Sequence, residues 1–350
     1  MSVVCKIKKK AGHFSLDVEF EIENETLAII GVSGSGKSMT LRCIAGIEKP
    51  DNGIIKIDGR TVFDSEKGIN LPPQKRHAGY LFQDFALFPN MTVSKNILTV
   101  MPKDKRDQLD SVITSLHLNG LENHYPSQLS GGQKQRCALA RMIASEPEII
   151  MLDEPFSSLD SHLKWQMELE VTSIIKKIGK TVLFVSHDRD EVYRISDRVL
   201  VIENGRSENI KEKQDLYQKP RTYSDALLTG CKNILPVKYE NGFIQTPGYG
   251  IQIPVVDHEK GYSYLGIRAK QMIPAHDFID CENAYLFEYQ IESVIESVFT
   301  MILMIRINGA ENQIRWEISK KEYILLKNYP KIIAIPKDKV MLLAESAYKC

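Results

Sequence analysis

A glycine-rich octapeptide, GVSGSGKS at residues 31–38, places a lysine and a hydroxyl behind three glycines. Because the glycines lack Cβ, the backbone can curl tightly and direct its N–H groups at phosphate oxygens. Lys37 can then reach the β- and γ-phosphates, while the Ser38 hydroxyl can ligate Mg²⁺. We therefore expect a nucleoside triphosphate here. The residues predicted to bind it are Gly31, Ser33, Gly34, Ser35, Gly36, Lys37, Ser38 and Met39.

An acidic pair, Asp153 and Glu154, follows a continuous apolar run at residues 149–152. Such a run suits a central parallel strand buried on both faces, and ligands of these sheets lie at the carboxyl ends of the strands. Because neighbouring side chains on a strand diverge, Asp153 can face the metal while Glu154 faces an attacking water. An acidic pair after a strand is more often a helix cap or a solvated edge, but the phosphate-binding loop upstream favours the catalytic interpretation.

A second glycine-containing segment, LSGGQ at residues 129–133, precedes a helical pattern. Ser130 and Gln133 form a capping box, so a well-capped helix is the simple interpretation. Gly131 and Gly132 add conformational entropy to the unfolded chain, and a compensating use for them is close approach of the backbone to an anion. One chain with one triphosphate needs only one such cradle, so the second one calls for an explanation.

Short apolar runs alternate with helical patterns up to about residue 205, which is typical of an α/β fold with a mainly parallel sheet. The segment from Val93 to Ser145 has helical patterns without a comparable strand, and we interpret it as part of a helical subdomain at about residues 88–146. The predicted parallel strands are residues 26–30, 149–153 and 181–186.

The character of the chain changes after Lys219-Pro220, where strand patterns become dominant. Residues 313–318 alternate strictly between apolar and polar side chains, as a half-buried strand does, and residues 301–307 and 340–343 are also strand-like. The spacing predicts a small β-barrel of roughly 120 residues. We therefore predict two domains, a nucleotide-binding domain at residues 1–225 and a β-barrel domain at residues 226–350.

Composition narrows the class of protein further. With 45 basic and 45 acidic residues the formal charge is zero, so no global field recruits nucleic acid or an anionic membrane. No apolar run approaches the roughly 20 residues that span a bilayer, and the N-terminus lacks a signal-peptide pattern, so a cytosolic protein is expected. The cysteines form no CxxC pair, which argues against a zinc site or a disulfide framework; they are Cys5, Cys43, Cys137, Cys231, Cys281 and Cys350.

Four motifs in this order and spacing, GVSGSGKS, LSGGQ, IIMLDE and VSHD, resemble those of the ATP-binding subunits of ABC transporters. The resemblance implies a P-loop NTPase with a helical subdomain, ATP and Mg²⁺ as ligands, and two copies that face each other head to tail. In that arrangement LSGGQ of one copy contacts the γ-phosphate held by GVSGSGKS of the other. The second glycine-containing cradle is then explained.

The same resemblance implies roles for four further residues. Gln83 matches the glutamine that senses Mg²⁺ and the attacking water, and Asp160 matches the loop that communicates across the dimer. His187 matches the histidine that contacts the γ-phosphate. Phe14 is a candidate for the aromatic residue that stacks on adenine, although an aromatic core residue is an equally good interpretation. Positioning and charge neutralisation then account for hydrolysis, with Glu154 as the base.

Residues 61–93 are similar to the corresponding stretch of molybdate importers' ATP-binding subunits, which also carry a C-terminal oxyanion-binding barrel. Residues 289–343 have the strand order and length of that barrel. Before its last strand, however, Asp338 follows Pro336 and Lys337 where the family has a lysine, a small residue and a serine. A carboxylate repels a dianion unless it is neutralised, so oxyanion binding and a structural or dimerising role both stay open.

The leading hypothesis is therefore an ATPase that powers import of molybdate or tungstate through a separate membrane permease, at the cytoplasmic face of the membrane. An extracytoplasmic solute-binding protein is an indirect partner by the same resemblance, and nucleic acid is not expected. Sulfate, iron(III) and sugar importers use nearly the same engine and form the first alternative. A soluble ABC ATPase acting on ribosomes or DNA fits less well, because the chain has one cassette and no long heptad run. An oxyanion sensor or store built on the barrel is a third alternative, but the complete set of catalytic residues argues against it.

Overall fold

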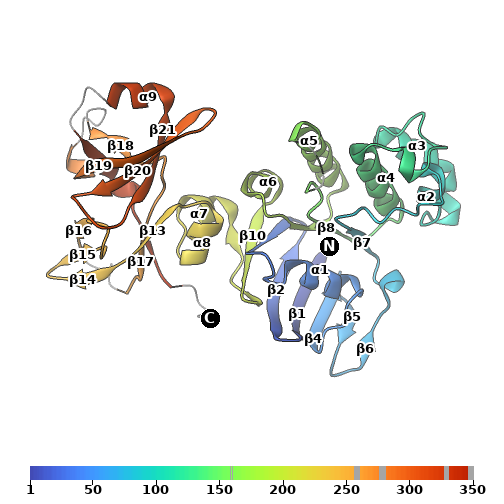
Figure 1. The fold of residues 1–350 in the computed structure, drawn as a ribbon. Coiled ribbons are helices and arrows are strands. Elements are labelled where there is room, and N and C mark those ends of the chain that lie inside the picture. Colours follow the sequence, from blue (N-terminus) through green and yellow to red (C-terminus); the bar gives the residue numbers. More distant parts are fainter. Residues whose placement is uncertain (158, 160, 256–260, 276–280, 327–330, 346–350) are drawn as a thin grey trace. The chain divides into compact units, whose positions relative to one another are not determined.

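A computed structural model describes residues 1–345, apart from residues 158, 160, 256–260, 276–280 and 327–330. The side chains of residues 161–163 and 281 are also outside the description. The chain divides into two compact units, Met1–Lys213 and Gln214–Cys350 (Figure 1). The domain boundary predicted between residues 225 and 226 falls inside a helix of the second unit, α8 (Tyr223–Leu228).

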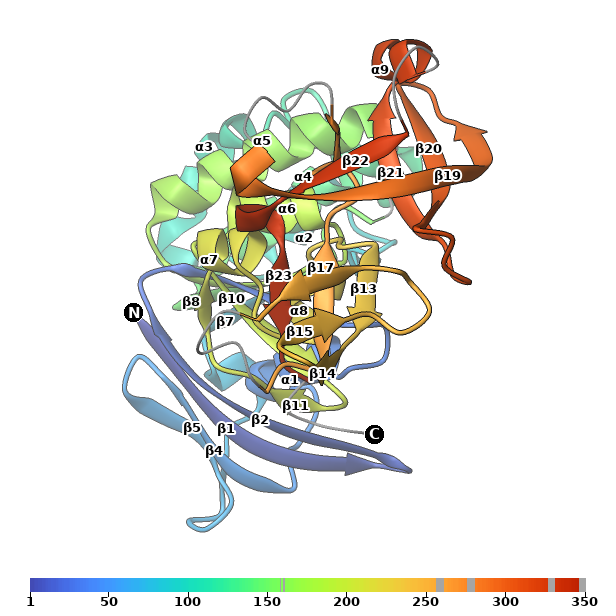
Figure 2. The same cartoon turned by 90° about the vertical axis from the view of Figure 1, so that its left-hand side faces the viewer.

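Among the described residues, the strands of the first unit form one sheet in the order β6-β5-β4-β1-β2-β11-β10-β3-β9-β8-β7, with β12 paired to β10. Half of this order is antiparallel and was not predicted. A tight hairpin joins β1 to β2, pairing Ala11 with Phe14, and Figure 2 shows this half as one curved layer. Its strands are β1 (Ser2–Ala11), β2 (Phe14–Glu23), β4 (Asn52–Ile57), β5 (Arg60–Asp64) and β6 (Ile69–Asn70).

The other half of the sheet is parallel and carries the predicted strands. The middle strands β3, β9 and β8 are buried at every residue, which accounts for their uninterrupted apolar sequences. Two parallel strands at its edges were not predicted, because each is short or bounded by charged residues. The parallel strands, in their spatial order, are β10 (Arg198–Glu203), β3 (Thr26–Ile30), β9 (Thr181–Val185), β8 (Ile149–Asp153) and β7 (Ala78–Leu81). The short strands β11 (Arg206–Ser207) and β12 (Lys211–Glu212) complete the sheet.

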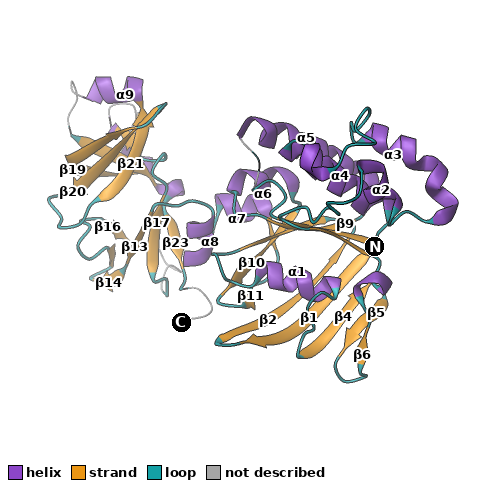
Figure 3. Ribbon diagram, turned by 45° about the vertical axis from the view of Figure 1, so that its right-hand side comes forward, coloured by secondary structure: helices purple, strands orange, loops and turns teal. Residues whose placement is uncertain are grey.

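Helix α1 packs between the antiparallel layer and the parallel strands, while α5 and α6 lie on the opposite side of the parallel strands (Figure 3). Leu41 and Ile44 of α1 are fully buried in the core that both layers share. Every residue from 93 to 145 is described, and none of them is in a strand, as the helical-subdomain prediction expects. The helices of this unit are α1 (Lys37–Ala45), α2 (Val93–Leu98), α3 (Leu109–Ser115), α4 (Gly131–Ala144), α5 (Ser161–Ile178) and α6 (Arg189–Ile195).

The second unit is a small β domain, as predicted. Its core surrounds Trp316, which is fully buried, donates from Nε1 to the carbonyl of Met272 at 2.8 Å and lies edge-on to Tyr289. Its described strands form three sheets, in the orders β13-β17-β23, β14-β15-β16 and β18-β22-β19-β20-β21. These strands are β13 (Asn233–Pro236), β14 (Lys238–Glu240), β15 (Phe243–Gln245), β16 (Gln252–Pro254), β17 (Tyr264–Ile267), β18 (Ile273–Pro274), β19 (Ala284–Glu296), β20 (Thr300–Ile307), β21 (Ile314–Ser319), β22 (Ile332–Pro336) and β23 (Met341–Leu343). Its helices are α7 (Lys213–Gln218), α8 and α9 (Lys320–Leu325).

Candidate functional site

The glycine-rich loop connects the end of β3 to the start of α1, as its pattern predicts. Two of its glycines are required by their neighbours. A Cβ on Gly31 would lie 2.1 Å from the carbonyl oxygen of Ile202, and Gly36 has a φ of 106° with Leu16 Cδ1 2.5 Å from the position of a Cβ. No L side chain fits either position without a shift of the backbone. Neighbouring strands therefore require glycine at both positions, and this allows the tight loop that is expected to present N–H groups to a phosphate.

Lys37 spans the inside of this loop. Its Nζ donates to the carbonyl oxygens of Gly31 at 3.0 Å and Val32 at 2.9 Å, and the residue is only 7% exposed. Burial lowers the pKa of Lys37, while the nearby Glu154 and Asp153 carboxylates oppose that shift. The ammonium group is thus held within the loop by two exchangeable bonds to carbonyls, at the place where phosphate oxygens are expected.

The remaining predicted residues of the loop lie around this centre. Ser35 is 3% exposed, and its Oγ has no hydrogen-bond partner among the described residues. Ser33 and Gly34 are exposed on the outer side of the loop, and Met39 packs partly buried against the core of the unit. A buried hydroxyl without a partner is costly, so the orphaned Ser35 Oγ fits a loop that is completed by a polar ligand.

Two of the predicted metal ligands, Ser38 and Asp153, lie together. Asp153 Oδ1 accepts a hydrogen bond from Ser38 Oγ at 2.8 Å, and its Oδ2 accepts one from Tyr80 Oη at 2.7 Å. The carboxylate is 5% exposed at the end of β8. A hydroxyl and a carboxylate are the hard oxygen ligands that Mg²⁺ prefers, so the donor set fits this ion. Among the described residues no three His, Cys, Asp or Glu side chains cluster as a metal site.

Tyr80 was not predicted from the sequence. It lies on β7, a strand that the sequence did not indicate, and β7 pairs with β8 so that Tyr80 stands opposite Met151. Burial and the neighbouring Asp153 carboxylate raise the pKa of Tyr80, which keeps the phenol protonated as a donor. In the sequence Tyr80 is a single tyrosine in a short run of mixed polarity. Only the pairing of β7 with β8 shows that it lies beside Asp153.

Glu154 follows Asp153 in a constrained turn. Its φ is 47°, a left-handed conformation that is uncommon for a residue with a side chain, and its N–H donates to the carbonyl of Val185 at 3.0 Å. Glu154 Oε2 lies 3.3 Å from Nδ1 of His187, which follows β9 and is largely exposed. The structure thus brings the predicted base and the predicted histidine together.

Gln83 reaches this site through an intermediary. Its Nε2 donates to Ser157 Oγ at 3.2 Å, and Ser157 Oγ donates to the carbonyl of Glu154 at 3.0 Å. In this state the amide is therefore connected to the turn that carries Glu154, and its role at the metal stays a prediction. Ser157 was not predicted, because a serine after an acidic pair has no distinctive signal. Asp160, predicted to communicate across a dimer, lies outside the described residues.

The LSGGQ segment begins α4 with the capping box that the sequence predicts. Gln133 N donates to Ser130 Oγ at 3.4 Å, and Ser130 N donates to Gln133 Oε1 at 2.9 Å. Neither Gly131 nor Gly132 has a positive φ, and a Cβ on Gly132 would meet no atom within 4 Å. Backbone conformation and packing within the chain therefore do not require these glycines, and the predicted approach of an anion to them stays a prediction.

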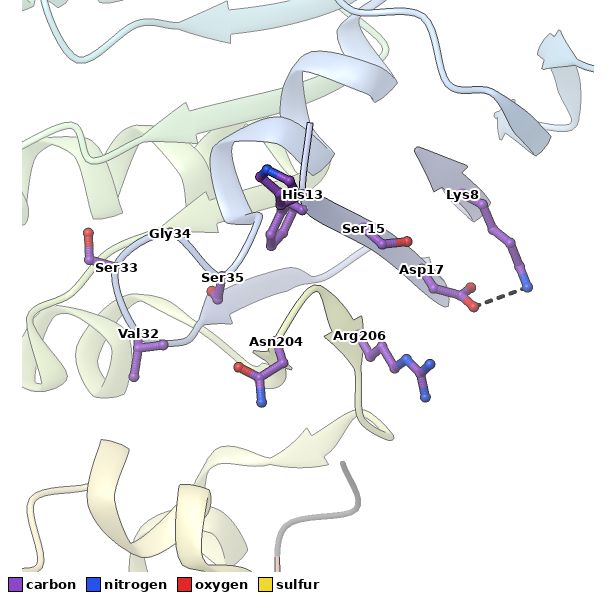
Figure 4. A pocket seen from close by; sticks show the side chains of 11 residues that line it. Lys8, His13, Ser15, Asp17, Val32, Ser33, Gly34, Ser35, Asn204 and Arg206 are labelled. Atoms are coloured by element: carbon purple, nitrogen blue, oxygen red, sulfur yellow. Dashed lines mark ion pairs between the residues drawn. The ribbon is translucent and has the colours of Figure 1, made fainter. Parts of the chain in front are cut away.

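A hollow of about 600 Å³ opens beside the loop, between residues 32–35, the β1–β2 hairpin and the turn after β10 (Figure 4). His13, Ser15 and Asp17 of the hairpin line it, and Asp17 forms an ion pair with Lys8 at 3.1 Å. Phe14 also lines this hollow, with its ring packed against Gly36 and Gly205, where a Cβ on either glycine would lie 3.1 Å from Phe14 Cζ. The ring is partly buried and partly at the wall of the pocket, so both interpretations of Phe14 stay open.

The Asp338 carboxylate of the second unit, which was expected to oppose oxyanion binding, has a neighbouring cation. Lys339 Nζ lies 2.7 Å from Asp338 Oδ2, and the Asp338 side chain is largely exposed. An exposed ion pair of this kind is weak, but it reduces the negative charge that a dianion would meet. Oxyanion binding and a structural role therefore remain alternatives for this unit.

Comparisons with a family model and with known proteins point to the same family. Residues 15–157 match the model of the family described as ABC transporter. The chain is 36% identical over 283 residues to a sulfate/thiosulfate import ATP-binding protein CysA of Bradyrhizobium diazoefficiens, covering 77% of this chain and 80% of that one. It is 33% identical over 307 residues to a spermidine/putrescine import ATP-binding protein PotA of Oleidesulfovibrio alaskensis, covering 84% and 81%. An Fe(3+) ions import ATP-binding protein, FbpC 2 of Haemophilus influenzae, is 38% identical and covers 63% of each chain.

Solved structures agree with this result. The ATP-binding cassette MJ0796, in a dimeric post-hydrolysis state bound to ADP and Pi, is 30% identical and superposes with a TM-score of 0.52. The match covers 61% of this chain and 99% of that one. These relatives are ATP-binding proteins, which agrees with the nucleotide site expected at the loop, the acidic pair and the capped glycine pair.

Proposed function

The chain belongs to the ABC transporter family as an import ATP-binding subunit, and from this premise we propose that it hydrolyses ATP between two copies of itself to drive uptake of a small solute. The observation that supports the proposal most directly is the convergence of Lys37, Ser38, Asp153, Glu154 and His187 at the carboxyl ends of β3, β8 and β9. ATP with Mg²⁺ supplies a polarised γ-phosphoryl group when it is bound. The residues of the chain supply position and charge.

Each side chain has a task that follows from its contacts. Lys37 exchanges its bonds to the Gly31 and Val32 carbonyls for phosphate oxygens, which neutralises charge on the transferring group. Ser38 and Asp153, which are hydrogen-bonded to each other, would supply a hydroxyl and a carboxylate oxygen to Mg²⁺. Glu154 orients a water molecule and accepts its proton, and His187 lies beside the same carboxylate. Gln83 contacts the Glu154 turn through Ser157, so it is placed to report the state of the site.

The second half of each site comes from another copy. Gly131 and Gly132 begin α4, where neither the backbone conformation nor the packing requires glycine. One bound triphosphate also does not need two glycine-containing phosphate-binding segments in the same chain. A head-to-tail pair in which Ser130, Gly131, Gly132 and Gln133 of one copy meet the γ-phosphate bound by the other explains both. The dimeric state of the similar cassette MJ0796 supports this arrangement. Asp160 belongs to the predicted contact between the copies.

A permease must carry the solute across the membrane. Among the described residues, no helix is long and apolar enough to cross a bilayer. We propose that the chain binds membrane permease subunits at the cytoplasmic face and depends indirectly on an extracytoplasmic solute-binding protein. The names of its relatives, all import ATP-binding proteins, support that role.

The cargo has two leading candidates. The similarity of residues 61–93 to molybdate importers supports molybdate or tungstate, whereas a relative matched over 80% of its length is named for sulfate and thiosulfate. Other relatives are named for spermidine, putrescine and Fe(3+). Because this subunit need not contact the transported solute, its ATP site is compatible with import of any of these solutes. We propose the oxyanions first, molybdate or tungstate ahead of sulfate.

Uptake by host cells tests the transport function. Cells that carry Glu154→Gln in place of the native residue should lose uptake of one labelled solute among molybdate, tungstate and sulfate. The exposed Glu21 offers a matched control, since Glu21→Gln removes the same charge far from the site and should leave uptake unchanged. Loss of molybdate or tungstate uptake alone supports the first candidate, and loss of sulfate uptake supports the second. Unchanged uptake of all three would reject an oxyanion as the cargo.

A further inference from the structure

Lys164, on the first turns of α5, contacts the segment that carries His187. Its Nζ lies 2.7 Å from Asp188 Oδ2 and 2.6 Å from Glu191 Oε1. The two carboxylates belong to α6 and its N-cap, so one ammonium group joins α5 to the loop after β9. Nothing in the sequence pattern distinguishes Lys164 from the other lysines of this helix.

The two residues that flank His187 are fixed by the same network. The Ser186 hydroxyl donates to Glu191 Oε2, and the backbone N–H of Asp188 donates to Ser186 Oγ at 3.0 Å. Asp188 Oδ1 also accepts from the N–H groups of residues 190 and 191, which caps α6. The backbone before and after His187 is thereby tied to Lys164, while the imidazole itself remains largely exposed beside Glu154.

The charges of this network depend on one another. The Glu191 side chain is only 4% exposed, and burial raises its pKa against the opposing effect of its bonds to Lys164 and Ser186. Burial would lower the pKa of Lys164, but its bonds to Asp188 and Glu191 raise the pKa on balance, so the ammonium stays charged. Removing it would leave a buried carboxylate without its cation, which is strongly unfavourable.

A separate ion pair joins the same two helices farther from the loop. Arg194 on α6 donates from Nε to Glu168 Oε2 on α5 at 2.9 Å, and its guanidinium lies over the ring of Trp165. Glu168 is 4% exposed, whereas the Arg194 side chain is 36% exposed, so the carboxylate of this ion pair is buried and its guanidinium reaches solvent. The packing of α5 on α6 therefore has its own support, and the distinctive effect of Lys164 is on the loop.

We infer that Lys164 is a positioning residue for hydrolysis, which holds the His187 loop against α5 so that the imidazole meets Glu154 and the γ-phosphate. The inference rests on the proposed function and adds a residue that acts through His187. The contacts of Lys164 are to Asp188 and Glu191, so we infer that it acts through the segment that carries His187.

A double-mutant cycle in ATP hydrolysis tests this assignment. In the full-length protein, Lys164→Met should lower kcat roughly ten- to hundred-fold with little change in KM, because it misplaces a group at the reacting centre. Lys164→Arg should retain most of the activity. The double variant with His187→Ala should be no slower than His187→Ala alone, since the two residues act as one unit. Lys177→Met, at an exposed position of the same helix, is the matched control and should behave as the wild type.

Losses from Lys164→Met and His187→Ala that multiply in the double variant would overturn the assignment, as would a wild-type kcat for Lys164→Met. If Lys164→Met does not fold, Lys164→Met with Glu191→Gln removes the unpaired carboxylate and must show the same loss of kcat and the same cycle. A wild-type protein without ATPase activity would instead overturn the proposed function, and this inference with it. The two failures are thus distinguishable.

Discussion

At the scale of single residues, the charged groups of the site are held in fixed places without a ligand. Lys37 is buried inside its loop, Asp153 is fixed by two hydroxyl donors, and Glu154 is turned toward His187 by a left-handed backbone. Such preorganised groups stabilise a developing charge without the cost of reorientation during the reaction. The site is therefore arranged for positioning more than for covalent chemistry.

Lys37→Ala gives the sharpest prediction at this scale. The ammonium group forms charge-assisted bonds to phosphate oxygens, which are worth about 1.5–3 kcal/mol, so we expect nucleotide affinity to fall roughly ten- to hundred-fold. Equilibrium binding of a fluorescent ATP analogue measures the loss. Lys176→Ala, which removes an exposed lysine from α5, serves as the control and should bind as the wild type does. Equal affinity in the Lys37→Ala protein would remove Lys37 from the site.

Residues with a strong local pattern could be predicted, and residues that depend on strand pairing could not. The loop, the acidic pair and the capping box each occupy consecutive positions, so their chemistry is visible in the sequence. Tyr80 and Ser157 reach the site from a neighbouring strand and from the turn after Glu154. Their position follows from the register of β7 on β8 and from the backbone of that turn, and neither is encoded in a short motif.

At the scale of elements, each functional group stands at a junction between a strand and a helix. The buried strands β3, β8 and β9 end side by side, which brings the loop, Asp153 and the His187 segment to one edge of the sheet. Continuous apolar runs made these three strands predictable. The antiparallel layer was not predicted, although β1 and β2 alternate as half-buried strands do, and the pairing of β1 with β4 joins residues as distant as Val3 and Ile57, which no short motif shows.

The N-terminus of α4 provides a prediction that separates a cap from a binding surface. Ser130→Ala removes a capping hydroxyl and should cost about 1 kcal/mol of stability. Ser319 makes the same kind of capping box with Glu322 at the start of α9, so Ser319→Ala should have a similar cost in the second unit. Only Ser130→Ala should also lower ATP hydrolysis, because we propose that only this cap meets the γ-phosphate held by another copy. Thermal unfolding and phosphate release, measured on both variants, give the comparison.

Equal hydrolysis by these two variants would contradict the proposed contact between α4 and the nucleotide of another copy. It would leave the capping box as a purely structural feature of α4. A loss of hydrolysis in Ser319→Ala would instead connect the second unit to catalysis, which the site geometry does not predict.

At the scale of the whole molecule, the chain joins an ATP-binding unit to a small β domain. Both units were predictable from the change to strand patterns after Lys219-Pro220, and each is built around its own core. The division between the units lies after Lys213, whereas the change of composition suggested a later position, because α7 and α8 are too short and polar to show which core they belong to. The residues of the proposed ATP site do not indicate which solute is transported, because they are expected to contact the nucleotide and not the solute.

The central claim is that ATP is hydrolysed between two copies of the chain with Glu154 as the base. Its most direct test is phosphate release and oligomeric state, measured together on the wild type and Glu154→Gln in the presence of ATP and Mg²⁺. We predict hydrolysis by the wild type, a loss of roughly a hundred-fold or more in Glu154→Gln, and a stable ATP-bound dimer that only this variant accumulates. Hydrolysis by Glu154→Gln at the wild-type rate, or a variant that stays monomeric with ATP bound, would contradict the account.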